Sequence, residues 1–304
     1  MKTLIAGGTG LIGGALSRSL VADGHEVVVL TRKPDERPDR LPDAVRLIGW
    51  DGKTGEGWSD ELPTTDVVVN LAGATIGPEG GLWTKARKQA ILQSRVQSTA
   101  ALIDGLRRVD QRPATLIQGS AVGFYGGQGS ALITEEAPNG DDFLADVVAA
   151  WEAASDDAET LGLRRVLLRT GVVLAAKGGT LNLLALPHKL FVGGPLGNGK
   201  QYIPWVHIDD EVAAIRFLME QPDLSGPFNI TAPNPVTNRA MSNALGKVLG
   251  RPSLLPTPAF LLKLLLGEMS VLVLEGQRAL PEALTESGFD FHFPNIEGAL
   301  RDLL

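Results

Sequence analysis

Short apolar runs alternate with longer segments of helical periodicity through the first half of the chain. A first run at residues 2–6 predicts a buried strand. After it, apolar positions recur at helical spacing until Gly24, at Leu11, Ile12, Ala15, Leu16 and Leu20. The alternation continues, with strands expected over 26–30, 66–71, 115–119 and 165–169 and helices over 83–109 and 143–161. This pattern predicts an α/β protein in which a doubly wound parallel sheet carries helices on both faces.

The pattern changes after about Thr170. Glycine and proline cluster over 178–204, residues 206–219 return to a strand and a helix, and prolines interrupt the chain from Gly226 onward. We therefore expect a larger domain over 1–170, to which 205–221 return. A smaller α/β C-terminal lobe, expected to hold the substrate, takes 171–204 and 222–304.

The turn between the first strand and the first helix is rich in glycine. Gly7, Gly10 and Gly13 stand at three-residue spacing. Without a Cβ, such a turn can adopt a positive φ and lie against a dinucleotide pyrophosphate, whose charge is stabilised at the helix N-terminus. A glycine-rich turn can also be a plain connection, but the strand before it and the helix after it favour a dinucleotide site. Residues 1–170 are thus expected to form a Rossmann domain.

The end of the second expected strand indicates which cofactor binds. NAD-binding folds usually carry an acidic residue there. This chain has Thr31, Arg32 and Lys33 instead, and no carboxylate lies between Glu26 and Asp35. Because a guanidinium can hold a ribose 2′-phosphate through paired hydrogen bonds, we predict NADP(H) rather than NAD(H). The alternative is that the two basic residues are solvated loop charges.

Composition narrows the class of protein. Of 304 residues, 44% are hydrophobic and 21% charged, which suits a globular protein with a substantial core. The net charge of −7 and the scattered basic residues argue against nucleic-acid binding. The absence of cysteine excludes disulfides and thiolate metal sites and fits a cytoplasmic protein, and the dispersed histidines indicate no metal site. The longest apolar stretch, 258–274, contains Lys263, Gly267 and Glu268, which predicts core helices rather than a membrane span.

Several segments resemble the extended short-chain dehydrogenases/reductases, the type of sugar-nucleotide epimerases and dehydratases. They are Gly7–Gly13, Asn70–Gly73, Ser120–Gly126 and Val206–Asp210. Finer motifs resemble an atypical subgroup, the YfcH-type "epimerase family" proteins, at Gly81–Thr84, Ser94–Val96, Asp142–Leu144, Trp151–Glu152, Leu168–Leu174, Ile203–His207, Gly276–Arg278 and Ser287–Phe289. The resemblance covers residues 1–304 and implies an NADP(H)-binding protein that acts on an unidentified small molecule.

The resemblance implies roles for particular residues. Those that would hold the cofactor pyrophosphate are Gly7, Thr9, Gly10, Leu11, Ile12 and Gly13. The 2′-phosphate would contact Thr31 and Arg32, and the path of the adenosine and the nicotinamide ribose would be lined by Leu71, Ala72 and Gly73. Arg95, on the long helix, and Arg169, at the end of a strand, are also expected to contact the cofactor. For both arginines, the alternative is a structural ion pair.

The catalytic pair of this superfamily is missing. Its reductases and epimerases use a tyrosine as acid/base, with a lysine four residues later that lowers the phenol pKa. The corresponding positions here are about Leu144 and Val148. Ser120 keeps the upstream hydroxyl, although an alignment on Tyr125 places Ala121 there instead. We predict that Ser120 bonds the reacting oxygen and that Tyr125 or a water gives the proton, although the counterpart of Tyr125 is usually a pocket or packing residue.

Two functions are consistent with these patterns. One is an NADP(H)-dependent oxidoreductase or epimerase-like enzyme, and the other is a non-catalytic NADPH-binding sensor or interaction protein, which the missing tyrosine/lysine pair favours. Asp142 is expected to cap a helix and His207 to pack structurally. Residues expected to shape the substrate pocket are Trp83, Lys85, Phe124, Tyr125, Phe143, Gln201 and Trp205. The substrate and the oligomeric state stay open.

Overall fold

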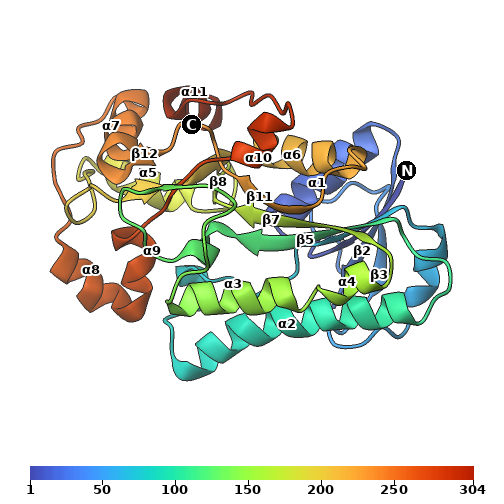
Figure 1. Ribbon diagram of the computed structural model, residues 1–304. Helices are drawn as coiled ribbons and strands as arrows, with labels where there is room; N and C mark the ends of the chain where they lie inside the picture. The colour runs from blue at the N-terminus through green and yellow to red at the C-terminus, as the bar shows by residue number, and fades with distance from the viewer.

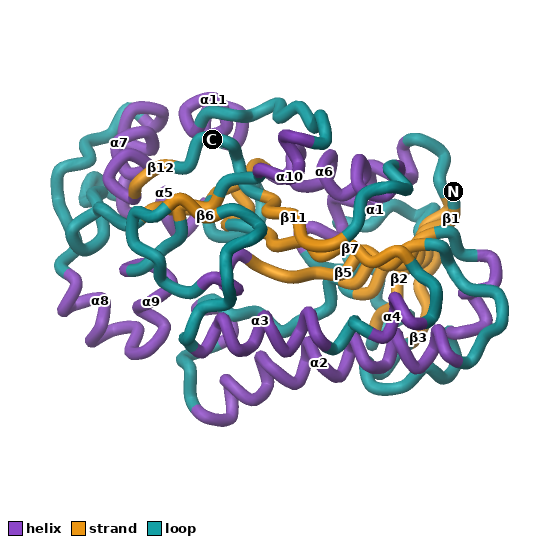
Figure 2. The backbone as a smooth tube through the Cα atoms, viewed as in Figure 1, coloured by secondary structure: helices purple, strands orange, loops and turns teal.

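A seven-stranded parallel sheet lies at the centre of the computed structural model, which describes residues 1–304 apart from the side chain of Pro78. Its order is β3-β2-β1-β4-β5-β7-β11. The strands are β1 (Lys2–Ala6), β2 (Glu26–Thr31), β3 (Arg46–Gly49), β4 (Val67–Asn70), β5 (Thr115–Ala121), β7 (Arg164–Thr170) and β11 (Gly226–Ile230). Figure 2 shows them as one layer between helices. The predicted doubly wound parallel sheet is confirmed.

Helices cover both faces of this sheet (Figure 1). One face carries α2 (Lys85–Arg107), α3 (Phe143–Ala153) and α4 (Asp157–Thr160), and the other carries α1 (Leu11–Ala22) and α6 (Ile208–Glu220). Alternate residues of β1 face the two layers, so that Leu4 belongs to the core with Leu102 of α2, and Ile5 to the core with Leu16 of α1. Burial on both faces explains why these strands are almost continuously apolar.

A smaller lobe lies at the end of the sheet far from the N-terminus (Figure 1). Its core joins Leu181, Trp205, Leu245 and Leu300, which come from four elements distant in sequence. The α-helices and strands not yet named are β6 (Leu132–Ile133), β8 (Val172–Leu174), α5 (Leu181–Lys189), β9 (Tyr202–Ile203), β10 (Trp205–His207), β12 (Val236–Thr237), α7 (Asn238–Leu249), α8 (Ala259–Leu266), α9 (Val271–Leu274), β13 (Arg278–Ala279), α10 (Glu282–Glu286) and α11 (Ile296–Leu303). Three short pairs, β8–β10, β9–β12 and β6–β13, connect its loops.

The C-terminal part differs from expectation in two elements. β11, expected in the smaller lobe, pairs with β7 as the edge strand of the main sheet, with Phe228 opposite Leu168. α8 is no core helix, because none of its residues is buried and Phe260 and Leu264 are 73% and 78% exposed. A run of apolar residues predicts a helix but does not show whether another element covers it. No helix in the described part of the chain is long and apolar enough to cross a membrane.

Candidate functional site

Three loops meet at the carboxyl ends of β2, β1 and β4. The three strands lie side by side, with Ala6 opposite both Leu30 and Asn70. The turn after Ala6, the residues after Leu30 and the residues after Asn70 therefore leave the sheet at one edge. The structure thus brings together the predicted cofactor residues Gly7–Gly13, Thr31, Arg32 and Leu71–Gly73.

The glycine turn is packed against the neighbouring loop. Gly7 has a φ of +81°, and a Cβ there would lie 2.5 Å from the carbonyl oxygen of Leu71. A Cβ on Gly13 would lie 2.5 Å from the carbonyl oxygen of Gly7. Thr9, Leu11 and Ile12 of the same turn are partly exposed. Only glycine at positions 7 and 13 allows this close approach of backbone to backbone.

The N-terminus of α1 has the features of an anion site. Gly10 is its N-cap residue, no side chain caps it, and its first turn holds no acidic residue. The backbone N–H groups of that turn are therefore free to bind an anion, and the helix dipole favours one. A dinucleotide pyrophosphate fits such a site.

Arg32 is the free cation beside this turn. Its side chain is exposed and forms no ion pair or hydrogen bond with any residue that the structure describes. The neighbouring Lys33 ammonium, in contrast, lies 2.7 Å from a carboxylate oxygen of Glu36. Of the two basic residues at the end of β2, only Arg32 thus has its charge unmatched.

A second feature is a cavity of about 230 Å³ between the ends of β5 and β7, helix α3 and the smaller lobe. Leu144 and Val148, the approximate positions expected for the tyrosine and lysine of the superfamily, both line it. Ala121, the alternative serine position, lines it as well. The place of the usual proton-transfer groups is therefore part of the cavity wall, but it is apolar.

Ser120 and Tyr125 belong instead to a buried polar network. Ser120 Oγ donates to Glu152 Oε1 at 2.5 Å. Arg169 binds both oxygens of Glu152, at 2.9 and 3.0 Å, and donates from Nη1 to the Tyr125 hydroxyl at 3.0 Å. Tyr125 in turn donates to Asn229 Oδ1 at 2.7 Å. Each of these side chains is thus held by hydrogen bonds to others in the network.

These contacts speak against the functional roles expected for Ser120, Tyr125 and Arg169. None of the three lines the cavity, and Tyr125 is fully buried. Burial raises the pKa of Tyr125, and the hydrogen bond from Arg169 offsets this only in part, so the phenol is a weak acid. The Arg169 charge is matched by Glu152, which is the structural ion pair named as the alternative. The roles were expected because sequence shows which residues are polar but not which of them bind one another.

Arg95 lies between the cofactor edge and the cavity. Its Nη1 donates to the carbonyl oxygens of Ala74 and Ile91, both at 3.0 Å, and its guanidinium lies 5.0 Å from the Trp151 ring centroid. A Cβ on Gly73 would lie 3.1 Å from Arg95 Cζ. Burial lowers the pKa of Arg95 to about 10, so it stays charged at neutral pH, and no carboxylate in the described part of the chain pairs with it.

The other polar groups of the cavity were largely missed from the sequence. Gln201 was expected there and lines it, whereas the other expected pocket residues do not: Trp83, Lys85, Phe124, Phe143 and Trp205. Polar lining residues that sequence reasoning missed are Tyr202, Asn238, Glu275 and Gln277. Of these four, Gln277 alone lies within a motif singled out from the sequence, Gly276–Arg278. Asp142 lines the cavity and, as expected, caps α3 by accepting from Ala145 N at 2.9 Å.

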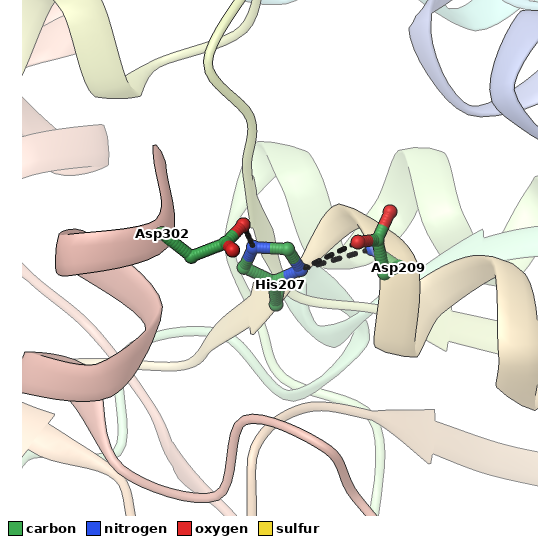
Figure 3. Close-up of side chains that lie close together, drawn as sticks. All are labelled: His207, Asp209 and Asp302. Atoms are coloured by element: carbon green, nitrogen blue, oxygen red, sulfur yellow. Dashed lines mark hydrogen bonds and ion pairs between the residues drawn. The ribbon is translucent and has the colours of Figure 1, made fainter. Parts of the chain in front are cut away.

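His207 lies between Asp209 and Asp302 (Figure 3). Its Nδ1 accepts from the backbone N of Asp209 at 3.1 Å, and its Nε2 lies 3.3 Å from Asp302 Oδ2. The ring is fully buried and stacks on Phe293 with 3.8 Å between centroids. One ligand atom of each of the three residues lies within 4.8 Å of the others, a grouping that the dispersed histidines of the sequence did not indicate. Through these contacts His207 connects the start of α6 to α11 and to the loop before α11.

Comparison with known proteins fits this architecture. The sequence profile of the "NAD dependent epimerase/dehydratase family" matches residues 3–231. "Epimerase family protein YfhF" of Bacillus subtilis is 39% identical over 305 residues, covering 100% of this chain and 98% of that protein. The chain belongs to the NAD-dependent epimerase/dehydratase family. Residues 257–303 of this family member also match a domain of unknown function, DUF1731.

Solved structures of similar proteins extend the comparison. The human epimerase family protein SDR39U1, crystallised with NADPH, has a TM-score of 0.87 and 31% identity, with 100% and 99% of the two chains covered. A nucleoside-diphosphate sugar epimerase from Corynebacterium glutamicum has a TM-score of 0.79 and 35% identity, and covers 100% of this chain but 58% of that one. UDP-glucose 4-epimerase of Thermus thermophilus, in complex with NAD, shares the fold at 19% identity and a TM-score of 0.74. The match to the atypical short-chain dehydrogenase/reductase type and its Rossmann nucleotide-binding fold is thereby confirmed.

Proposed function

We propose that this chain binds NADP(H) in preference to NAD(H) and uses it as an oxidoreductase or epimerase-like enzyme on a small molecule held in the cavity. The 2′-phosphate is assigned to Arg32 and Thr31, the pyrophosphate to Gly7–Gly13, and the riboses to Leu71–Gly73. When bound, the cofactor supplies hydride transfer.

The observation that carries the proposal is the unmatched charge of Arg32 beside the open N-terminus of α1. A guanidinium in this position can bind a phosphate through paired hydrogen bonds. No acidic residue stands there to accept a hydrogen bond from a ribose 2′-hydroxyl. The NADPH complex of human SDR39U1, 31% identical, supports the same choice of cofactor.

Equilibrium titration with NADPH and NADH tests this choice. Arg32→Ala is expected to weaken NADPH binding about 10- to 100-fold, as loss of a charge-assisted pair does, and to leave NADH binding nearly unchanged. Lys33→Ala is the matched control, since its ammonium pairs with Glu36, and is expected to change either affinity less than about threefold. Equal affinities for both cofactors in the unchanged protein would contradict the proposal.

A non-catalytic NADPH-binding protein is the second candidate function, and the apolar side chains of Leu144 and Val148 in the cavity wall favour it. Incubation of the protein with NADPH deuterated at C4 and a panel of carbonyl compounds separates the two. Deuterium in a product supports the enzyme. Tight NADPH binding with no transfer to any compound would favour the sensor or interaction protein.

A further inference from the structure

The charged groups of the cavity lie at two separate ends. Arg95 lies at one end, beside Trp151. Asp142 lies at the other, directly before α3 begins. Asp142 and Trp151 are nine residues apart, so about 13 Å of the α3 axis lies between their backbones at 1.5 Å per helical residue. The cavity therefore has a cationic end and an acidic end.

A second carboxylate adds to the acidic end. Glu275 Oε2 would lie 2.5 Å from a Cβ on Gly127, and Asp142 Oδ2 would lie 3.2 Å from a Cβ on Gly126. Since Gly126 and Gly127 are consecutive, the two carboxylates face the same part of the wall. An anionic group of a ligand is repelled there.

At the cationic end, the Arg95 guanidinium has hydrogen-bond donors without a partner among the described residues. It is the one cationic side chain of the lining, and its Nε and Nη2 donate to no residue that the structure describes. A partly buried guanidinium without a carboxylate is costly unless a ligand supplies the anion. Most of the remaining lining is apolar and includes Ile76, Leu144, Val147, Val148 and Leu272, while Gln201, Tyr202, Asn238 and Gln277 are uncharged polar residues of the lining.

We propose that the cavity binds a small, mainly apolar monocarboxylic acid, whose carboxylate pairs with Arg95 and whose hydrocarbon body lies along α3. The planar guanidinium matches a carboxylate, and the apolar wall matches the body. The acidic end disfavours a second anionic group, so a dicarboxylate or a nucleoside diphosphate fits poorly. This inference rests on the proposed function in one respect. Arg95 lies next to Gly73, which the proposed function assigns to the cofactor, so the bound carboxylate would lie beside the cofactor.

Isothermal titration of the NADPH-saturated protein with hexanoate, octanoate and decanoate tests the inference. The best of these is expected to bind at least tenfold more tightly than its neutral amide, and more tightly than suberate or UDP-glucose. Arg95→Met is expected to weaken carboxylate binding about 10- to 100-fold. Arg107→Met, an exposed arginine on the same helix, is the matched control and is expected to change nothing.

The outcomes separate the inference from the proposed function. Three results would overturn the inference while NADPH binding stands. They are equal affinities for the carboxylate and its amide, no binding of any of the three acids, and full carboxylate affinity in Arg95→Met. If NADPH fails to bind, the proposed function fails, and the acid-against-amide comparison without cofactor still tests the cavity. Should Arg95→Met not fold, the same comparison on the unchanged protein and on Arg95→Lys decides.

Discussion

Single buried polar residues decide much of the chemistry of this molecule. Asn70 donates to Thr99 Oγ1 and Gln118 Oε1, both at 2.9 Å, and accepts from Ala72 N, so that it fixes the loop that passes the glycine turn. Glu211 is fully buried on α6, and its Oε1 accepts from Thr170 Oγ1 at 2.9 Å. Its Oε2 has no partner among the described residues. Such a carboxyl is stable in its neutral form.

Glu211 predicts a pH-dependent stability. Burial raises its pKa from 4.5 to about 8, so the folded protein keeps a proton there that the unfolded chain has lost. The free energy of unfolding therefore falls as pH rises between these two values, by about 1.4 kcal/mol per pH unit at most, and levels off above them. Urea denaturation of the natural protein and of Glu211→Gln at pH values across this range measures it. The variant, which cannot ionise, is expected to gain stability relative to the natural protein as pH rises. A difference between the two proteins that stays constant with pH would contradict the assignment.

At the scale of elements, the β1–α1 turn is the feature with the strictest geometric demand. Gly13 and Gly14 are consecutive in α1, but only Gly13 faces backbone atoms. A Cβ on Gly13 would lie 2.6 Å from the Cα of Gly8. A Cβ on Gly14 would meet the Cδ of the flexible Arg40 side chain at 2.9 Å. Two glycines that look alike in sequence therefore differ in what they tolerate.

Substitution of these two glycines tests the argument. Gly13→Ala is expected to lower the free energy of unfolding by about 1–3 kcal/mol, because backbone must shift, and to weaken NADPH binding. Gly14→Ala is expected to change it by less than about 1 kcal/mol, since an alanine favours the helix and Arg40 can move aside. Urea denaturation and NADPH titration of both variants give the answer. Equal losses would show that the turn itself is not the sensitive point.

At the scale of the whole molecule, the C-terminal segment is tied to the Rossmann sheet rather than appended to it. β13 pairs with β6, and Asn229 of the edge strand β11 donates from Nδ2 to the carbonyl oxygen of Leu280 at 2.9 Å. Asp210 of α6 accepts from the backbone N of His292 at 2.8 Å and of Phe293 at 2.9 Å. The cavity lies between these parts, so its shape depends on their attachment.

The attachment at Asp210 can be tested against its neighbour. Asp210→Ala removes the buried carboxylate that accepts from two backbone N–H groups and is expected to cost about 2–4 kcal/mol of unfolding free energy. Asp209→Ala, whose carboxylate is 70% exposed, is expected to cost less than about 1 kcal/mol. Limited proteolysis near residue 292 measures the local effect, with faster cleavage only in Asp210→Ala. Equal cleavage of both variants would assign the attachment to other contacts.

The sequence by itself determined the parallel sheet, the glycine turn and the place of Arg32, because each depends on residues close together in the chain. Strand periodicity, a turn that requires glycine and the end of a strand are local properties. The tertiary structure alone decided that Arg169 pairs with Glu152, that β11 joins the sheet, that α8 lies exposed and that Arg95 meets the cavity without a carboxylate. These outcomes depend on which distant segments pack together. The sequence around a polar residue does not show which side chain will form its hydrogen bond or ion pair.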